Sequence, residues 1–211
     1  MHNQIITIGR QFGSGGRLIG EGLAKELGYT FFDKELIHLA SKESGLGKEF
    51  FERADEKTKF GLFGGFLGLR TGISVDSFLQ NYLSNETLFK IQSDVIRELA
   101  EKQSCVFVGR CADYILRDYP NCTNIFITAH VEDRVRRIAE RQHLDETKIP
   151  ELLEKTDKKR AGYYNYYTNK TWGAAASYHF CINSSLVGIE KTIQFILKLV
   201  ASLGQHATIR N

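Results

Sequence analysis

The chain of 211 residues has 42% hydrophobic and 25% charged residues, an ordinary globular composition that excludes disorder, collagen-like repeats and solenoid arrays. Its 28 basic and 25 acidic side chains leave a net charge of +3, well short of the excess expected of a general nucleic-acid coat protein. Any anionic ligand must therefore be held by local clusters of charge. The chain has 19 glycines and only 2 prolines. So many glycines indicate places where the backbone adopts a positive φ or comes close to another group.

The start of the chain and its cysteines bear on the cellular compartment. Residues 1–9 enter an apolar run with no basic leader and no small-residue cleavage site, so we expect a cytoplasmic protein. The four cysteines form no C-x-x-C pair and the six histidines show no ligand spacing, which predicts no metal site and no disulfide framework. The longest uncharged apolar stretch, residues 60–69, is shorter than the ~20 residues of a membrane-spanning helix, and we expect no membrane partner.

The first third of the chain reads as the opening of a βαβ unit. The β-branched run Ile5 to Ile8 precedes a glycine cluster, and apolar residues then recur at helical spacing, which predicts a strand, a tight loop and a helix. Gly28 is placed to end that helix, a second strand follows at Tyr29 to Phe32, and a helix is expected from about Lys34 to Lys42.

Residues 44–83 differ in character, because seven glycines between residues 45 and 72 alternate with phenylalanines. This pattern favours a small helical insertion outside the central sheet, with mobile loops that move over or choose an acceptor. An exposed apolar interface patch centred on residues 60–69 is the competing interpretation.

Regular structure is predicted again after this segment. Apolar residues at helical spacing predict an amphipathic helix over residues 86–102. Three further apolar runs predict buried parallel strands, and a final helix follows them. These strands are expected at residues 105–108, 125–128 and 178–182. The sequence therefore predicts one domain over residues 1–211, a three-layer α/β fold with a five-stranded parallel sheet.

The loop after the first strand, residues 9–17, reads Gly-Arg-Gln-Phe-Gly-Ser-Gly-Gly-Arg. A glycine-rich turn that opens a helix presents backbone N–H groups to a phosphate, so we predict that Gly13, Ser14, Gly15, Gly16 and Arg17 bind ATP phosphates. The motif G-x-x-x-x-G-K-[ST] would place a lysine where Gly16 stands, and a hydroxyl for Mg²⁺ is missing as well. Arg17 is the expected substitute cation. A purely structural turn is the alternative.

A helix predicted at residues 130–142 carries a strip of arginines. At 100° per residue, Arg134, Arg137 and Arg141 lie together beside an expected core stripe of Val131, Val135 and Ile138, while Arg136 points away. Such a strip is either a solvated face or a set of cations that neutralises a transferred phosphoryl group.

The motifs taken together resemble the cytidylate kinase-like branch of the P-loop kinases, over nearly the whole chain. The resemblance rests on the glycine loop and on a series of later pieces that follow it in the expected order. These pieces are Phe32-Asp33, Val108-Gly109-Arg110, Thr128-Ala129 with Arg134, Arg136 and Arg137, Asp157 with Lys158 and Arg160, and residues 178–183. An acidic residue that the family places near Asn183 is an amide here, and one arginine is replaced by Thr156.

The resemblance implies a P-loop NTPase-like fold and transfer of a phosphoryl group from ATP, with Mg²⁺, to a nucleoside monophosphate such as CMP or dCMP. It implies that Arg110 contacts the acceptor phosphate and that Asp33 faces the acceptor or Mg²⁺, although Arg110 could instead cap the sheet edge and Asp33 the next helix. Asp157 is assigned to the substrate. The lid, expected within residues 140–172, would close with catalytic Arg134, Arg137, Arg160 and the loop's Arg17.

Two other classes of function remain open from the sequence. The altered glycine loop also suits a nucleotide-binding regulator without catalysis, and residues 60–69 could serve an interaction module. Tyrosines at residues 163–167, with Lys170 and Trp172, either pack a helix against the core or form a stacking platform for single-stranded nucleic acid. We expect a small-molecule acceptor and no nucleic acid.

Overall fold

The structure is a computed structural model that describes residues 3–43, 45 and 75–209, with the side chains of residues 75–85 and 204–209 left out. The described residues fall into two compact units, one within Met1–Lys34 and Leu99–Asn211 and the other within Glu35–Glu98. The first unit contains the sheet. Most of the expected insertion at residues 44–83, including the apolar stretch 60–69, lies outside the described residues.

The sheet has five parallel strands in the order β2-β3-β1-β4-β5. Their bounds are β1 Ile5–Arg10, β2 Thr30–Phe32, β3 Cys105–Val108, β4 Cys122–Thr128 and β5 Phe180–Asn183. All five predicted strands are confirmed, with β5 beginning at Phe180, two residues later than expected. The central β3 is buried along its whole length, as a continuous apolar run predicts. In the centre of the sheet, Ile8 of β1 is in register with Val108 of β3 and with Ile125 of β4.

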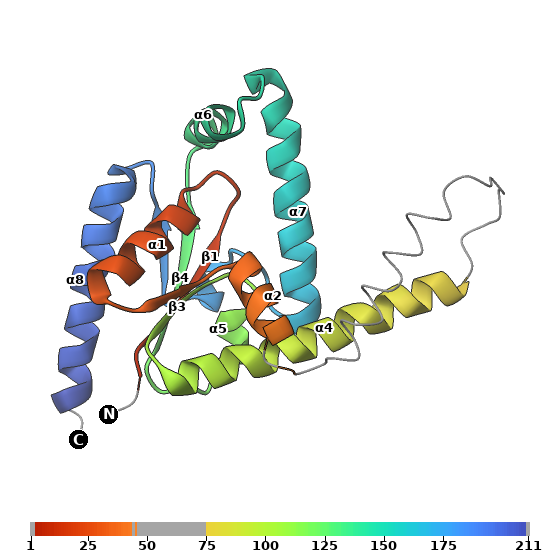
Figure 1. Cartoon of the computed structure of the whole chain (residues 1–211). Coiled ribbons are helices and arrows are strands. Elements are labelled where there is room, and N and C mark those ends of the chain that lie inside the picture. Colours follow the sequence, from red (N-terminus) through yellow and green to blue (C-terminus); the bar gives the residue numbers. More distant parts are fainter. Residues whose placement is uncertain (1–2, 44, 46–74, 210–211) are drawn as a thin grey trace. The chain divides into compact units, whose positions relative to one another are not determined.

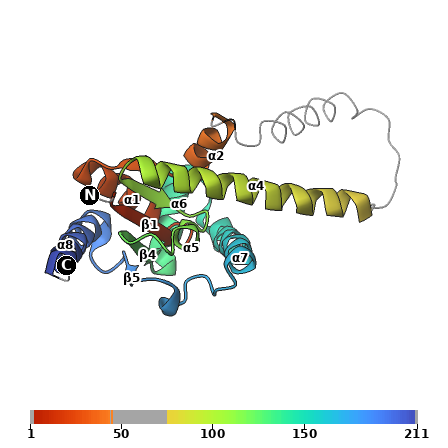
Figure 2. The same ribbon diagram turned by 90° about the horizontal axis from the view of Figure 1, so that it is seen from below.

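The helices of the first unit connect these strands. Their bounds are α1 Gly16–Leu27, α5 Ala112–Ile115, α6 Val131–Gln142, α7 Ile149–Thr168 and α8 Gly188–Ile209. Helices α1 and α8 lie side by side and pack against one face of the sheet, while α7 lies on the other side (Figures 1 and 2). Short 3₁₀ turns, Glu146–Lys148 and Ala175–Ser177, complete the connections. Gly28 ends α1 with a φ of 69°, as predicted.

The main core fills the space between the sheet and the α1/α8 pair. Its fully buried members include Ile6 and Ile8 of β1, Ile19 and Leu23 of α1, and Ile196 of α8. A second cluster joins Ile138 of α6 to Ile149 and Leu153 of α7. Burial of about 25 cal/mol per Å² of apolar surface makes these two clusters the main stabilising contribution of the unit. They fix the carboxyl ends of the strands, where the candidate site lies.

The second unit holds α2, Lys34–Glu43, and most of α4, Val75–Lys102. The predicted helix at 34–42 is confirmed, whereas the helix expected from residue 86 begins eleven residues earlier, at Val75. Residues 75–85 contain neither glycine nor proline, so nothing in their backbone interrupts the helix. Among the described residues, no helix is long and apolar enough to span a membrane.

Candidate functional site

The glycine loop joins the end of β1 to the start of α1. Gly13 and Gly15 have φ values of 80° and 81°, a left-handed conformation that a side chain disfavours. The N–H groups of Gly13, Gly15 and Gly16 have no acceptor among the described residues. Since the first N–H groups of a helix attract anions, the loop can donate several hydrogen bonds to a phosphate. The buried Ser14 hydroxyl instead donates to the Gln11 carbonyl at 2.9 Å.

Three arginines from α6 and α7 converge on this loop. Each donates a hydrogen bond to a backbone carbonyl of the loop: Arg134 to Phe12 at 2.7 Å, Arg137 to Gly13 at 3.4 Å and Arg160 to Arg10 at 3.0 Å. The prediction that Arg134 and Arg137 share one side of their helix is thus confirmed. Close packing accompanies the hydrogen bonds, because a Cβ added to Gly13 would lie 2.8 Å from the Arg134 carbonyl oxygen.

Asp157 of α7 contacts both the glycine loop and Arg134. Its carboxylate accepts a 2.7 Å hydrogen bond from the Phe12 N–H and forms an ion pair with Arg134, whose side chain is only 7% exposed. Two guanidinium groups lie near the centre of the Phe12 ring, that of Arg141 at 5.6 Å and that of Arg160 at 5.4 Å. Burial lowers the pKa of the Arg160 guanidinium. Charges this enclosed need partners, and Asp157 supplies one.

The outer face of α6 differs in part from the expectation. Arg136 points away from the loop and pairs with Asp133, as predicted. Val131, expected in the core stripe, is 53% exposed, so this prediction is wrong. The apolar contact between α6 and α7 ends at Val135, and Val131 lies one turn beyond that contact.

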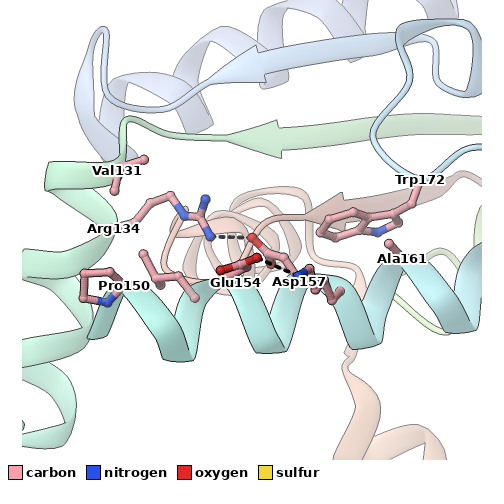
Figure 3. Close-up of a pocket in the computed structure, with 9 residues that line it drawn as sticks. Val131, Arg134, Pro150, Glu154, Asp157, Ala161 and Trp172 are labelled. Carbon is pink, nitrogen blue, oxygen red and sulfur yellow. Dashed lines mark hydrogen bonds and ion pairs between the residues drawn. The ribbon is translucent and has the colours of Figure 1, made fainter. Parts of the chain in front are cut away.

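A hollow of about 400 Å³ lies beside the Arg134–Asp157 pair. Figure 3 shows the two side chains meeting in the middle of this hollow, with the Trp172 ring at one end. Its lining is formed by Val131, Arg134, Pro150, Leu153, Glu154, Asp157, Lys158, Ala161 and Trp172. The hollow therefore combines apolar side chains with a largely buried ion pair.

Arg17 and Asp33, predicted for different roles, lie together. The Arg17 Nε donates to Asp33 at 2.8 Å, its Nη1 to Glu21 at 3.1 Å, and its guanidinium lies 5.6 Å from the centre of the Phe31 ring. The Asp33 side chain is 5% exposed, whereas that of Arg17 is 51% exposed. The guanidinium of Arg17 is thus directed to the end of β2.

Arg110 stands in a turn with an uncommon backbone. Gly109, Arg110 and Cys111 follow β3 with φ values of 83°, 57° and 56°. Two successive non-glycine residues in this region cost of order 1 kcal/mol or more each, and such strain clusters at functional sites. The Arg110 guanidinium lies 5.3 Å from the centre of the Tyr163 ring, and burial raises the pKa of the Tyr163 hydroxyl.

Sequence reasoning assigned no site contact to two residues, Ser184 and Tyr164. The Ser184 hydroxyl donates to the Ser14 carbonyl at 2.7 Å and accepts from Arg137 at 3.2 Å, which joins the end of β5 to the glycine loop. Its place just after the last strand was the available signal. The buried Tyr164 hydroxyl donates to Asp113 at 2.7 Å, and burial raises the pKa of the Asp113 carboxyl. Tyr164 thus confirms that part of the tyrosine cluster packs inward.

Carboxylates near the loop, such as Asp33 and Asp157, act as partners of arginines. Among the side chains described in residues 3–43, 45 and 86–203, no group of three or more His, Cys, Asp or Glu is arranged to hold a metal ion. Asp33 is the carboxylate that the structure brings to the loop side of β2.

The sheet order and the glycine loop define a fold of the P-loop kinase class. A shikimate kinase from Bacteroides thetaiotaomicron has the same fold, with a TM-score of 0.51, 16% identity and 94% of this chain matched to 98% of that one. A gluconokinase from Sinorhizobium meliloti 1021 has a TM-score of 0.50 at 12% identity, over 99% of this chain and 97% of that one. At these identities, the likeness concerns the fold.

More particularly, the chain belongs to the cytidylate kinase-like family, whose model matches residues 5–186. An uncharacterized protein from Eubacterium ventriosum ATCC 27560 is 29% identical, with a TM-score of 0.71 over 95% of this chain and 99% of that one. No curated protein gives a significant match. The resemblance noted in the sequence is thereby confirmed, and in general terms the chain is a phosphotransferase of the P-loop kinase class.

Proposed function

We propose that this protein transfers the terminal phosphoryl group of ATP to the phosphate of a small acceptor, a nucleoside monophosphate such as CMP or dCMP. The observation that carries the proposal is the convergence of Arg134, Arg137 and Arg160 on the glycine loop of a cytidylate kinase-like chain. Phosphoryl transfer depends almost wholly on positioning and charge neutralisation, and clustered arginines provide both.

The glycine loop is the proposed phosphate cradle. The backbone of Gly13, Ser14, Gly15, Gly16 and Arg17 would hold the ATP phosphates, and the N–H groups of three of these residues lack an acceptor among the described residues. ATP supplies the phosphoryl group. The arginines of α6 and α7 orient the loop through its carbonyls. The lid, expected within residues 140–172, would close over them and exclude water from the transfer.

The acceptor phosphate is assigned to Arg110, with Asp33 and Asp157 beside the acceptor. Arg110 follows β3 at the carboxyl edge of the sheet, where ligands of open α/β folds bind, and its strained turn supports a role in binding. No general base is needed because an ionised acceptor phosphate is already nucleophilic. Four free thiols fit the cytoplasmic location expected from the sequence.

The site offers Mg²⁺ one candidate carboxylate and no hydroxyl from the glycine loop. A magnesium ion in such enzymes takes one or two carboxylates, with phosphate oxygens and water as the remaining ligands. Asp33 is the candidate carboxylate, whereas the Ser14 hydroxyl is engaged by the Gln11 carbonyl. The ion would neutralise charge on the phosphates, and Arg17 would share Asp33 with it.

A panel of acceptors tests the proposal. ADP release is measured with ATP and Mg²⁺ and with CMP, dCMP, UMP or a hydroxyl compound as acceptor. We expect release that requires both Mg²⁺ and one of the monophosphates, with CMP or dCMP best. Absence of release above background with every acceptor would exclude a kinase acting on these compounds.

The second candidate function is a nucleotide-binding regulator without catalysis. It is favoured by one observation: Arg17, the expected substitute for the missing lysine, is paired with Asp33 and Glu21. Such a regulator would be stabilised by ATP in thermal unfolding and would release no ADP. An interaction module would show no ATP-induced shift in melting temperature.

A further inference from the structure

The position of the missing lysine is occupied by another side chain. In the phosphate-binding motif, the lysine follows the last glycine of the loop and reaches the β- and γ-phosphates. Here that position is Gly16, the first residue of α1. If the loop binds ATP, its cation must come from a residue elsewhere in the chain.

Arg10, the last residue of β1, passes directly over Gly16. A Cβ added to Gly16 would lie 2.6 Å from the Arg10 Cβ and 3.1 Å from the Arg10 Cγ. Real Cβ atoms do not approach this closely, so the stem of Arg10 fills the volume that a lysine at residue 16 would need. A side chain at residue 16 is therefore excluded as long as residue 10 carries a Cβ in this position, and the arginine at residue 10 is compatible with the glycine at residue 16.

The far end of the same side chain reaches the neighbouring turn. A Cβ added to Gly109 would lie 1.9 Å from the Arg10 Nη1 and 3.0 Å from its Cζ. The Gly109 N–H donates to the Ile8 carbonyl at 3.0 Å, which keeps this turn beside β1. Arg110, the proposed acceptor contact, comes next in the chain. The Arg10 guanidinium therefore lies between the glycine loop and the acceptor turn.

The main chain of Arg10 is held independently of its side chain. Its carbonyl accepts the hydrogen bond from Arg160, and it is in register with Ile127 of β4. Helix α7 thus holds the main chain of Arg10 through Arg160. Gly16 and Gly109, which lack side chains, leave room for the aliphatic part and the guanidinium of Arg10. A half-buried arginine fixed in this way is prearranged to bind an anion.

We propose that Arg10 supplies the phosphate-binding cation that Gly16 lacks, and that it grips the terminal phosphates of a nucleoside triphosphate. The inference rests on the proposed function. In this proposal Arg10 replaces a lysine on α1. Because its guanidinium lies beside Gly109, it would contact the phosphates on the side that faces Arg110 and the acceptor. A guanidinium makes two parallel hydrogen bonds to phosphate oxygens, which an ammonium does not.

Calorimetric titration with inorganic tripolyphosphate and with ATP tests the inference without relying on turnover. Arg10→Met keeps most of the stem over Gly16 and removes the charge, and we expect it to weaken tripolyphosphate binding roughly 10- to 100-fold. Arg117→Met is the control, because it removes a guanidinium that lies on the surface, over the Tyr114 ring and next to Asp118. The control should bind as the wild type does.

The titrations distinguish the role of Arg10 from the proposed function as a whole. Wild-type binding with an unchanged affinity in Arg10→Met would overturn the role of Arg10 and leave the proposed function standing. A wild-type protein that binds neither tripolyphosphate nor ATP would overturn both.

A swap variant guards against a merely structural effect. Arg10→Gly combined with Gly16→Lys returns the cation to the motif position and removes the Arg10 Cβ and Cγ that a Cβ at residue 16 would overlap. We expect this protein to bind tripolyphosphate more tightly than Arg10→Gly alone. A folded swap variant that binds no more tightly than Arg10→Gly would contradict the overlap of the two cation positions.

Discussion

The turn from β1 into α1 and the turn from β3 into α5 leave the same edge of the sheet, but they meet their backbone demands differently. The first uses glycine at both residues with positive φ, Gly13 and Gly15, whereas the second also places Arg110 and Cys111 in that conformation. Glycine relieves strain and exposes N–H groups, while a strained arginine presents a charged side chain. One turn therefore suits binding by the backbone and the other suits binding by a side chain.

The two turns also differ in what holds them in place. The glycine loop is fixed by side chains from α6, α7 and the residue after β5, through its carbonyls and one N–H. The β3 turn is fixed by the ladder bond from Gly109 and by the Tyr163 ring beside Arg110. Changes in α6 should therefore reach the first turn much more strongly than the second, whereas α7 contacts both.

The largest expected effect comes from Gly13→Ala. Alanine there is strained by the positive φ and meets the Arg134 carbonyl at 2.8 Å, so we expect a loss of about 3 kcal/mol in the free energy of unfolding, measured in urea. Gly28→Ala has a similar φ of 69° and nothing within 4 Å, and should cost about 1 kcal/mol. Equal losses in the two variants would show that the loop is not held by α6.

Asp157→Asn should follow, with a loss of about 2 kcal/mol in unfolding free energy. The substitution keeps an acceptor for the Phe12 N–H but leaves the buried Arg134 without its counter-charge. Asp94→Asn, at a surface ion pair with Arg97 whose side chains are 45% and 50% exposed, is the control and should leave the urea midpoint nearly unchanged. A midpoint for Asp157→Asn like that of the control would show that the ion pair of Asp157 with Arg134 does not stabilise the fold.

Arg110→Met tests the second turn. Loss of the guanidinium should raise the KM for the acceptor monophosphate roughly tenfold, with a smaller change in the KM for ATP. The same measurement on Arg117→Met, which also lies over a tyrosine ring, should give wild-type constants. A larger rise in the KM for ATP than in that for the acceptor would reverse the division of labour between the two turns.

Features that depend on neighbouring residues in the sequence could be predicted, whereas contacts between distant segments could not. The strands follow from apolar runs, and the shared side of Arg134 and Arg137 follows from helical spacing. The space for the Arg10 side chain depends on the register of β1 against β3 and on the angle at which α1 leaves the loop, which no local pattern encodes. The same holds for the pairing of Arg17 with Asp33. Val131 was misplaced because helical periodicity does not say where the neighbouring helix stops.

The smallest expected effect is a pH dependence at the base of the second turn. Burial raises the pKa of the Asp113 carboxyl, so the folded protein holds this proton more tightly than the unfolded chain does. The contribution of Asp113 to stability therefore falls as pH rises from about 4, and levels off above the folded pKa. The free energy of unfolding of Asp113→Asn relative to the wild type should rise over that interval. Asp118→Asn, on an 88% exposed carboxyl, provides the control.

The central claim is that the glycine loop and the arginines of α6 and α7 form a phosphoryl-transfer site. The most direct measurement is ³¹P NMR of the protein with ATP, Mg²⁺ and CMP, beside the same mixture with Arg137→Met. We predict conversion of ATP and CMP to ADP and CDP by the wild type, slowed roughly 100-fold in the variant. Intact ATP in the wild-type mixture, or equal rates in both mixtures, would contradict the claim.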